Sequence, residues 1–185
     1  MMEIFKDGAK VTSGTAIDLN ESTGIDIVAT GDGHEGDFTI SVEETSIRYA
    51  NVVVSNAEII ALRATPKTLV AAPGAGKMLE LVSATLQLNY GGTNVFTESS
   101  DNLIINYVDA SGVAATGAIE STGFIDATED AFTTVLAVPV VNATTAQVVN
   151  TALILDNTGD GEIAGNAGED NTMSVFVVYR IHTVA

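Results

Sequence analysis

Cysteine and tryptophan are both absent from the 185 residues of the chain, and aromatic residues make up only 5% of it. Without cysteine there can be no disulfide, no thiolate metal ligand and no cysteine nucleophile. Sugar-binding sites use exposed aromatic rings for stacking, and here 4 Tyr and 6 Phe must also fill a core. These absences weigh against a disulfide-stapled miniprotein, a thiol enzyme and a carbohydrate-binding module.

Basic residues are also scarce, with 7 Lys and Arg against 24 Asp and Glu and a net charge of −17. Lys77 and Arg180 have no Lys or Arg between them. Binding to nucleic acid requires clustered cations that neutralise phosphates, so we expect no nucleic-acid partner. The acidity itself is typical of a protein kept soluble by mutual repulsion, while adaptation to salt and a basic partner remain open alternatives.

Long hydrophobic runs are missing as well. No window approaches the roughly 18 apolar residues that span a membrane. The segment from Met1 to Asp7 has no basic leader followed by an apolar run. We therefore expect no membrane partner and no signal peptide, with synthesis in the cytoplasm.

The residues that are abundant indicate an all-β fold. Hydrophobic residues make up 46% of the chain, and short runs rich in Val, Ile, Thr, Leu and Phe alternate with clusters of Gly, Asn, Asp and Ser. This pattern predicts an antiparallel β-sandwich or a jelly-roll-like barrel. The predicted strands are Ile25–Thr30, Asp37–Val42, Ile47–Ser55, Glu58–Arg63, Thr68–Ala72, Met78–Tyr90, Leu103–Val108, Gly117–Ile125, Phe132–Val138, Val148–Leu155 and Met173–Thr183.

Two of these strands have unusual patterns. In Met78–Tyr90 the apolar alternation changes phase, which predicts a bulge near Val82 and Ser83. The last strand has apolar residues on both faces, including Phe176 and Val178 on the second one. This pattern suits a central strand, or a strand whose second face is buried by a neighbouring subunit.

The chain changes character near Ser55 and Asn56. Shorter segments rich in glycine and acidic residues come before this point, and longer apolar strands come after it. We interpret residues 1–56 as an N-terminal β extension or arm and residues 57–185 as the main β-sandwich domain. The arm could add a strand to the sheet of a neighbour.

The segment from Ala72 to Met78 ends like a phosphate-binding loop but departs from that pattern. A phosphate loop needs glycine at Ala71 and Ser or Thr at Met78, and it leads from a strand into a helix. Here a strand is predicted to follow. We interpret the segment as a Pro-Gly turn between strands.

The segment from Asp156 to Glu162 has the Asp-x-Thr-x-Asp-Gly order of a calcium loop. Its twelfth position is Ala167, where a bidentate glutamate is expected. Weak calcium binding through Glu162, Glu169 or Asp170 and a solvated hairpin turn are the two open interpretations. We predict no metal site and no cofactor.

Catalysis has little support in the sequence. The only histidines are His34 and His182, and the carboxylates lie mostly in predicted turns. We interpret His182 as a surface or interface residue of the last strand. We therefore predict no catalytic residues and no enzymatic activity.

Several segments, in order over about residues 57–185, resemble structural proteins of tailed bacteriophages and prophages. The segments that carry this resemblance are 61–77, 88–93, 96–103, 122–124 and 157–162. The resemblance implies a part of the virion and brings no catalytic residues with it.

Two placements in a virion follow from the resemblance. The first is a head decoration or cement protein, a compact β domain bound to the capsid exterior, often as a trimer, whose partners are the major capsid protein and copies of itself. The second is a tail or tail-fibre component. We favour decoration because the chain is short, acidic and without repeats or heptads. A calcium- or carbohydrate-binding β-sandwich is the remaining alternative.

Overall fold

The structure is a computed structural model. It describes residues 5–6, 9–10, 25–30, 37–42, 46–98, 101–109, 111–140, 142–159, 161–165, 168 and 170–184. The chain consists of two compact units, Met1–Glu43 and Glu44–Ala185. No helix among the described residues is long and apolar enough to cross a bilayer.

The N-terminal unit contains two separate antiparallel pairs of strands. Strand β1 (Phe5–Lys6) pairs with β2 (Ala9–Lys10), and β3 (Ile25–Thr30) pairs with β4 (Asp37–Val42) over their full lengths. The structure confirms the two strands predicted from the sequence at β3 and β4. Residues 31–36, which connect the two strands, lie outside the described residues.

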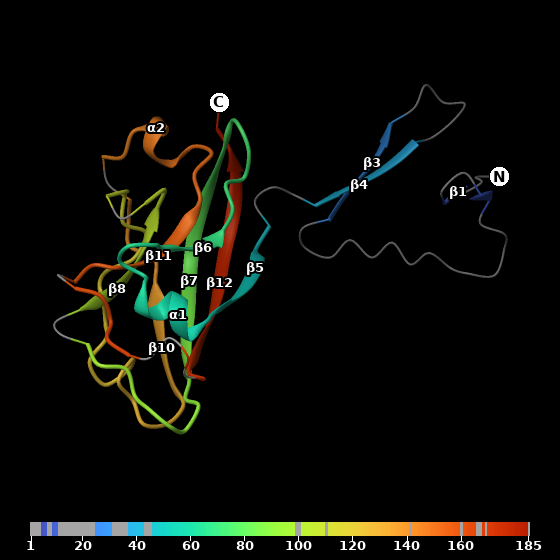
Figure 1. Cartoon of the computed structure of the whole chain (residues 1–185). Helices are drawn as coiled ribbons and strands as arrows, with labels where there is room; N and C mark the ends of the chain where they lie inside the picture. Colours follow the sequence, from blue (N-terminus) through green and yellow to red (C-terminus); the bar gives the residue numbers. More distant parts are fainter. Residues whose placement is uncertain are drawn as a thin grey trace. The chain divides into compact units, whose positions relative to one another are not determined.

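The second unit is an antiparallel β-sandwich of two four-stranded sheets (Figure 1), as the sequence predicts. Sheet one has the order β10-β7-β12-β5 and sheet two the order β6-β11-β8-β9. The strands are β5 (Arg48–Val54), β6 (Lys67–Val70), β7 (Lys77–Asn89), β8 (Asn102–Tyr107), β9 (Ile119–Glu120), β10 (Ala131–Leu136), β11 (Leu153–Asn157) and β12 (Thr172–Thr183).

The order of the strands is that of a jelly roll. The first strand of the sandwich pairs with the last, β5 with β12, and the nesting continues with β6 and β11, β7 and β10, and β8 and β9. This is a long hairpin, and rolling it up brings β7 beside β12 and β8 beside β11. Eight antiparallel strands wound in this way form the double-sheet jelly roll.

The hydrophobic core fills the space between the two sheets. Leu79, Leu86 and Val175 of sheet one are fully buried, as are Ile105 and Leu155 of sheet two. Each sheet therefore buries one face against the other, as the two-residue period of a strand requires.

A bulge in β7 keeps its apolar residues on the core side. Ser83 pairs with Val178 and Leu81 pairs with Tyr179, so Val82 is an extra residue in the ladder. Leu81 and Ala84 are both buried, although they stand three positions apart. This confirms the bulge predicted near Val82 and Ser83.

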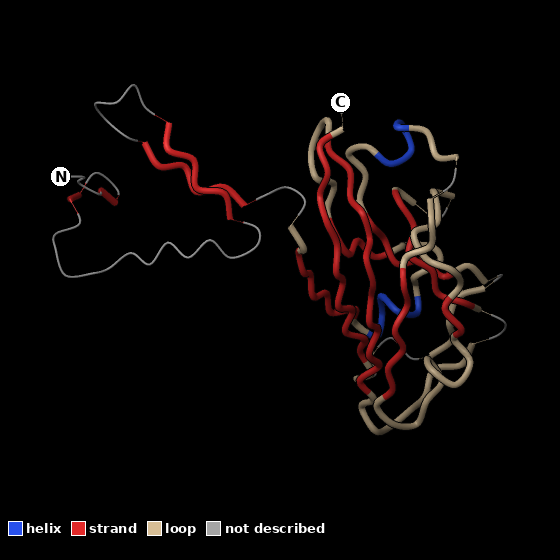
Figure 2. Tube along the Cα trace, turned by 180° about the vertical axis from the view of Figure 1, so that it is seen from behind, coloured by secondary structure: helices blue, strands red, loops and turns tan. Residues whose placement is uncertain are grey.

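Three of the predicted strands are wrong in part. Helix α1 (Asn56–Ile60) occupies the position of the predicted strand Glu58–Arg63. The predicted strand Gly117–Ile125 shrinks to β9, with a turn after it. Helix α2 (Thr145–Val148) comes before β11, so the predicted strand Val148–Leu155 begins too early. Figure 2 shows these two helices as short segments in a unit made mostly of strands.

The helices form where side chains supply the missing hydrogen bonds of a first turn. At α1, Ser55 is the N-cap and Glu58 accepts hydrogen bonds from the Ser55 amide and hydroxyl, both at 2.9 Å. Thr144 and Gln147 form the same capping box at α2. A capping box outweighs the β preference of the following Ile59 and Ile60.

The sandwich begins earlier in the chain than the predicted boundary at residue 56. Strand β5 pairs with β12 over its whole length, so Arg48–Val54 is an edge strand of sheet one. The division between the units falls after Glu43.

Candidate functional site

The outer face of sheet one is the surface that best fits a functional contact. The strand registers place its outward-facing residues in three rows of four across β10, β7, β12 and β5. The rows are Phe132, Gln87, Ser174, Val53; then Thr134, Thr85, Phe176, Asn51; then Leu136, Ser83, Val178, Tyr49. We call these residues the neutral face.

The large apolar side chains of the neutral face are exposed. Phe132 is 77% exposed, Tyr49 76%, Leu136 70% and Val53 58%, and they occupy the four corners of the face. Phe176, in the middle row, is 40% exposed. Soluble monomers rarely expose so many large apolar groups together, and such a patch marks an interaction surface.

The neutral face carries no acidic or basic side chain, although the chain as a whole has a net charge of −17. The interiors of protein interfaces are depleted in charged residues and enriched in aromatic ones. The neutral face therefore has the composition of the interior of a protein interface.

Polar groups on and beside the neutral face hydrogen-bond to one another. The hydroxyl groups of Thr85 and Thr134 are 3.1 Å apart across β7 and β10. The side-chain amide of Asn89, at the border of the face, donates to the Ser174 hydroxyl at 3.2 Å and accepts from Gln87 at 3.1 Å. Polar groups that already have partners cost less to remove from water, so these polar positions do not oppose burial of the face.

Charged residues begin where the neutral face ends, beyond the bulge in β7. Glu80 Oε2 lies 2.7 Å from His182 Nε2 and 3.2 Å from a terminal guanidinium nitrogen of Arg180. The hydrogen bond with His182, together with the Arg180 guanidinium, holds the pKa of Glu80 below its ordinary value. These half-exposed groups balance one another locally, so the cluster is not strongly acidic.

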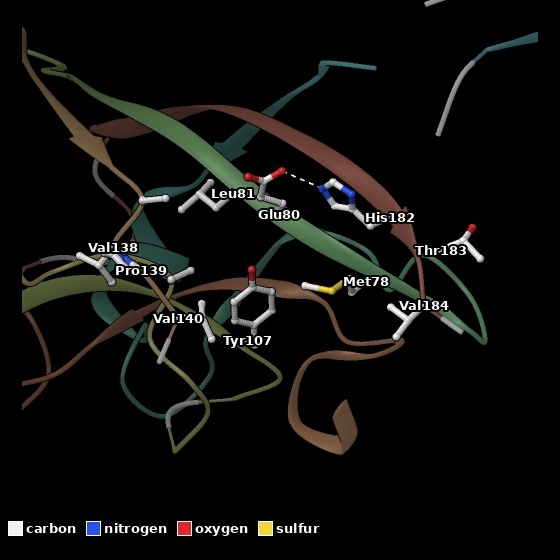
Figure 3. A pocket seen from close by; sticks show the side chains of 12 residues that line it. Met78, Glu80, Leu81, Tyr107, Val138, Pro139, Val140, His182, Thr183 and Val184 are labelled. Carbon is white, nitrogen blue, oxygen red and sulfur yellow. Dashed lines mark hydrogen bonds and ion pairs between the residues drawn. The ribbon is translucent and has the colours of Figure 1, made fainter. Parts of the chain in front are cut away.

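A groove of about 810 Å³ lies beside this cluster, where the chain leaves β10 (Figure 3). Its walls are mainly apolar, and the side chains of Glu80 and His182 line it from sheet one. The other lining residues are Met78, Leu81, Tyr107, Ala115, Ala137, Val138, Pro139, Val140, Thr183 and Val184.

Tyr107 closes the edge of β7 at this groove. Strand β10 pairs with β7 only as far as Ser83, so the backbone beyond that point lacks this neighbour. The Tyr107 hydroxyl donates a 2.9 Å hydrogen bond to the Leu79 carbonyl oxygen, and the Leu81 backbone amide donates to the Tyr107 hydroxyl oxygen. Burial raises the pKa of Tyr107. A side chain of sheet two thus replaces the missing strand and blocks an edge that could pair with another chain.

The segment that resembles a phosphate loop is a connection between two strands. It joins β6 to β7, and Gly74 and Gly76 adopt φ values of 102° and 71°. The Gly74 amide donates to Asn150 Oδ1 at 2.9 Å. Lys77 begins strand β7, as the sequence predicts, so the loop does not lead into a helix as a phosphate loop does.

In the segment that resembles a calcium loop, the potential ligands have other roles. Glu162 accepts hydrogen bonds from the Arg63 and Ala64 amides at 3.2 and 2.9 Å, which ties down the turn after α1. Asn157 accepts from the Gly159 amide at 2.8 Å. Asp160 lies outside the described residues, as do Ala167 and Glu169. In the part of the chain that the structure describes, no three His, Asp or Glu side chains gather as metal ligands.

Asp156 is buried at the end of β11, with 2% of its surface exposed. Its Oδ1 atom has no hydrogen-bond partner among the described residues. Burial raises the pKa of Asp156, because removal from water disfavours the charged form.

Sequence reasoning identified part of the neutral face and missed the rest. The two-sided apolarity of the last strand pointed to Phe176 and Val178. Phe132 and Leu136 lie on another strand, and only the register β10-β7-β12 brings them to the same face. The contact of Glu80 with His182 was missed for the same reason, because their strands are far apart in the chain.

Comparison with known proteins gives weak similarities. No protein-family model matches the chain, and no curated protein is significantly similar to it. A chain of the "Cyanophage Pam1 capsid asymmetric unit" aligns with a TM-score of 0.38 and 18% identity, over 89% of this chain and 99% of that one. A chain of Israel acute paralysis virus aligns with a TM-score of 0.22 and 11% identity, over 99% of this chain and 91% of that one.

At these identities and TM-scores, neither alignment assigns a function to the chain.

Proposed function

We propose that the chain is a non-enzymatic structural protein of a tailed phage virion, a decoration or cement protein on the exterior of the capsid. Its partners are the major capsid protein and copies of itself, with a trimer as the favoured assembly. Residues 1–43 serve as an arm that binds a neighbouring subunit. The role is mechanical, because a bound domain that bridges capsid subunits stabilises the shell.

The observation that carries the proposal is the neutral face. Five exposed apolar side chains on an uncharged sheet face suit a protein that is permanently bound to other proteins. The acidic remainder of the chain suits dense display on a particle, where like charges keep neighbouring particles apart. The sequence resemblance to virion structural proteins, over about residues 57–185, points to the same role.

Proximity of Glu80 and His182 does not by itself favour an enzyme. The pair lies beside a mainly apolar groove, and Glu80 is also bound to Arg180. General acid–base catalysis needs a proton donor or acceptor aimed at a reacting group, whereas here both side chains are directed at each other (Figure 3). A structural tie between β7 and β12 accounts for this arrangement.

The test is the position and copy number of the chain in purified phage particles, measured by quantitative mass spectrometry and cryo-electron microscopy. We expect density for the jelly roll on the outer surface of the shell, repeated at every equivalent lattice position. A few copies at one vertex or along the tail would replace decoration with a tail role. Absence from the particle would overturn the proposal.

A further inference from the structure

We infer that the neutral face binds the neutral face of a second copy of this chain, so that two sandwiches pack sheet against sheet about a two-fold axis. The inference rests on the proposed function in one respect, that the chain works as an assembly of copies. It further identifies the neutral face as the surface through which two copies bind each other.

The first argument is electrostatic. A second copy also carries a net charge of −17, and close approach of two acidic surfaces is opposed by like-charge repulsion. A contact made through the uncharged rows keeps the acidic side chains of both copies out of the interface. A strongly basic partner would instead be drawn to the acidic parts of the surface.

The second argument is the symmetry of the pattern. A two-fold axis that runs through the middle row, at right angles to the strands, exchanges the first and third rows. Phe132 then lies opposite Leu136 of the second copy, and Val53 lies opposite Tyr49. Apolar corners therefore meet apolar corners, and Phe176 meets its own counterpart at the centre. Self-complementarity of this kind is what an isologous contact requires.

The third argument is the geometry of sheet packing. Two sheet faces pack with side chains interdigitated at a separation of about 10 Å. The five large apolar side chains alternate with short ones, Ser83, Thr85, Ser174 and Asn51 among them. The short neighbours leave room beside each pair of large groups that meets across the axis, so that these groups can interdigitate.

A two-fold contact uses the same surface of both subunits, so it joins two copies and no more. The trimer of the proposed function would need other surfaces, so the two assemblies do not compete for the neutral face. Four strands about 4.8 Å apart bury only a small interface area. We therefore expect weak association that depends on protein concentration.

The experiment is sedimentation velocity of the full chain over a wide range of concentration, with two variants that add the same charge. Phe176→Asp places a carboxylate at the centre of the neutral face. Val95→Asp places one in the loop after β7, at a residue that is 38% exposed and off the face. We expect the original chain and Val95→Asp to associate alike, and Phe176→Asp to raise the dissociation constant on the order of 100-fold.

A chemical cross-link gives an independent readout on a protein without cysteine. Asn51 is exposed in the middle row, so Asn51→Cys places one thiol opposite its counterpart. A short bismaleimide should join Asn51→Cys into dimers and leave Val95→Cys as monomers. Both measurements report on folded protein, because Phe176, Asn51 and Val95 all lie outside the core.

The inference is overturned if the original chain stays monomeric at every concentration, if Phe176→Asp associates as the original does, or if Asn51→Cys does not cross-link. These failures differ from failure of the proposed function, which is decided by the presence of the chain in phage particles. A monomeric chain found on capsids would remove the two-fold contact and leave the decoration role intact.

Discussion

The hydroxyl group of Tyr107, in sheet two, donates a 2.9 Å hydrogen bond to the carbonyl oxygen of Leu79, in sheet one. This bond crosses the core of the sandwich at the place where β10 no longer covers β7. It satisfies a buried backbone acceptor that would otherwise lie at an open sheet edge. One aromatic side chain therefore both joins the two layers and protects the edge.

Tyr107→Phe should destabilise the sandwich by about 1–3 kcal/mol, because the Leu79 carbonyl would stay buried without its donor. The measurement is the free energy of unfolding in urea. Tyr49→Phe is the matched control, since Tyr49 is 76% exposed and its hydroxyl can exchange with water. Equal effects of the two substitutions would show that the hydrogen bond to Leu79 contributes nothing.

Asp156→Asn should stabilise the chain at neutral pH. Burial raises the pKa of Asp156 above its ordinary value of 3.8, so between these two pKa values the folded state binds more protons than the unfolded state. Stability of the original chain therefore falls as the pH rises through that window. Asparagine has a similar shape and no charge to bury.

The measurement for Asp156 is the difference in unfolding free energy between the variant and the original chain at several pH values. This difference should grow from the acid side of pH 3.8 upwards and level off above the raised pKa. The lowered pKa values of Glu58 and Glu80 make stability rise with pH, opposite to the effect of Asp156. Both groups are present in the variant and in the original chain, so their contributions cancel in the difference. A difference that does not change with pH would contradict the prediction.

Leu86→Ala and Leu136→Ala make the same chemical change on opposite faces of sheet one. Leu86 is fully buried in the core, and its truncation should cost about 2–5 kcal/mol. Leu136 is 70% exposed, and its truncation should change stability by less than about 0.5 kcal/mol in dilute protein. Thermal unfolding at low protein concentration compares the two, and a large loss at Leu136 would mean that the outer face contributes to the fold.

Removal of residues 1–43 should leave the sandwich folded. The buried hydrophobic residues that the structure describes lie between Val54 and Val177, all within the second unit. We expect residues 44–185 to unfold in one cooperative transition at the melting temperature of the sandwich in the full chain. A chain that loses this transition on truncation would show that the sandwich depends on its N-terminal unit.

The sequence predicted the sandwich well because its strands have a clear two-residue period. Strands β3 and β4 have the predicted bounds, and the change of phase in β7 located the bulge at Val82. Helix α1 was missed because Ile59 and Ile60 favour strands, although Ser55 and Glu58 already had the spacing of a capping box. That local signal could have corrected the prediction.

The neutral face shows what the sequence could not supply. Alternation along one strand indicates which residues share a face, but it does not say which strands are neighbours. Phe132 and Phe176 come to the same surface only because β7 separates their strands in the sheet. Registers between distant segments depend on the whole fold, so single-strand patterns predicted only part of the site.

The nested pairing of the jelly roll has a consequence for how the chain reaches its folded state. Strand β5 pairs in sheet one only with β12, which follows all the other strands in the chain. During synthesis on a ribosome, β5 therefore emerges long before β12 has been made. Strand β7 likewise lacks a hydrogen-bonding neighbour on one edge until β12 is made. Contacts between such distant segments slow folding. The central strand of the sheet is synthesised last, so each new chain exposes an incomplete hydrophobic sheet until β12 inserts between β7 and β5.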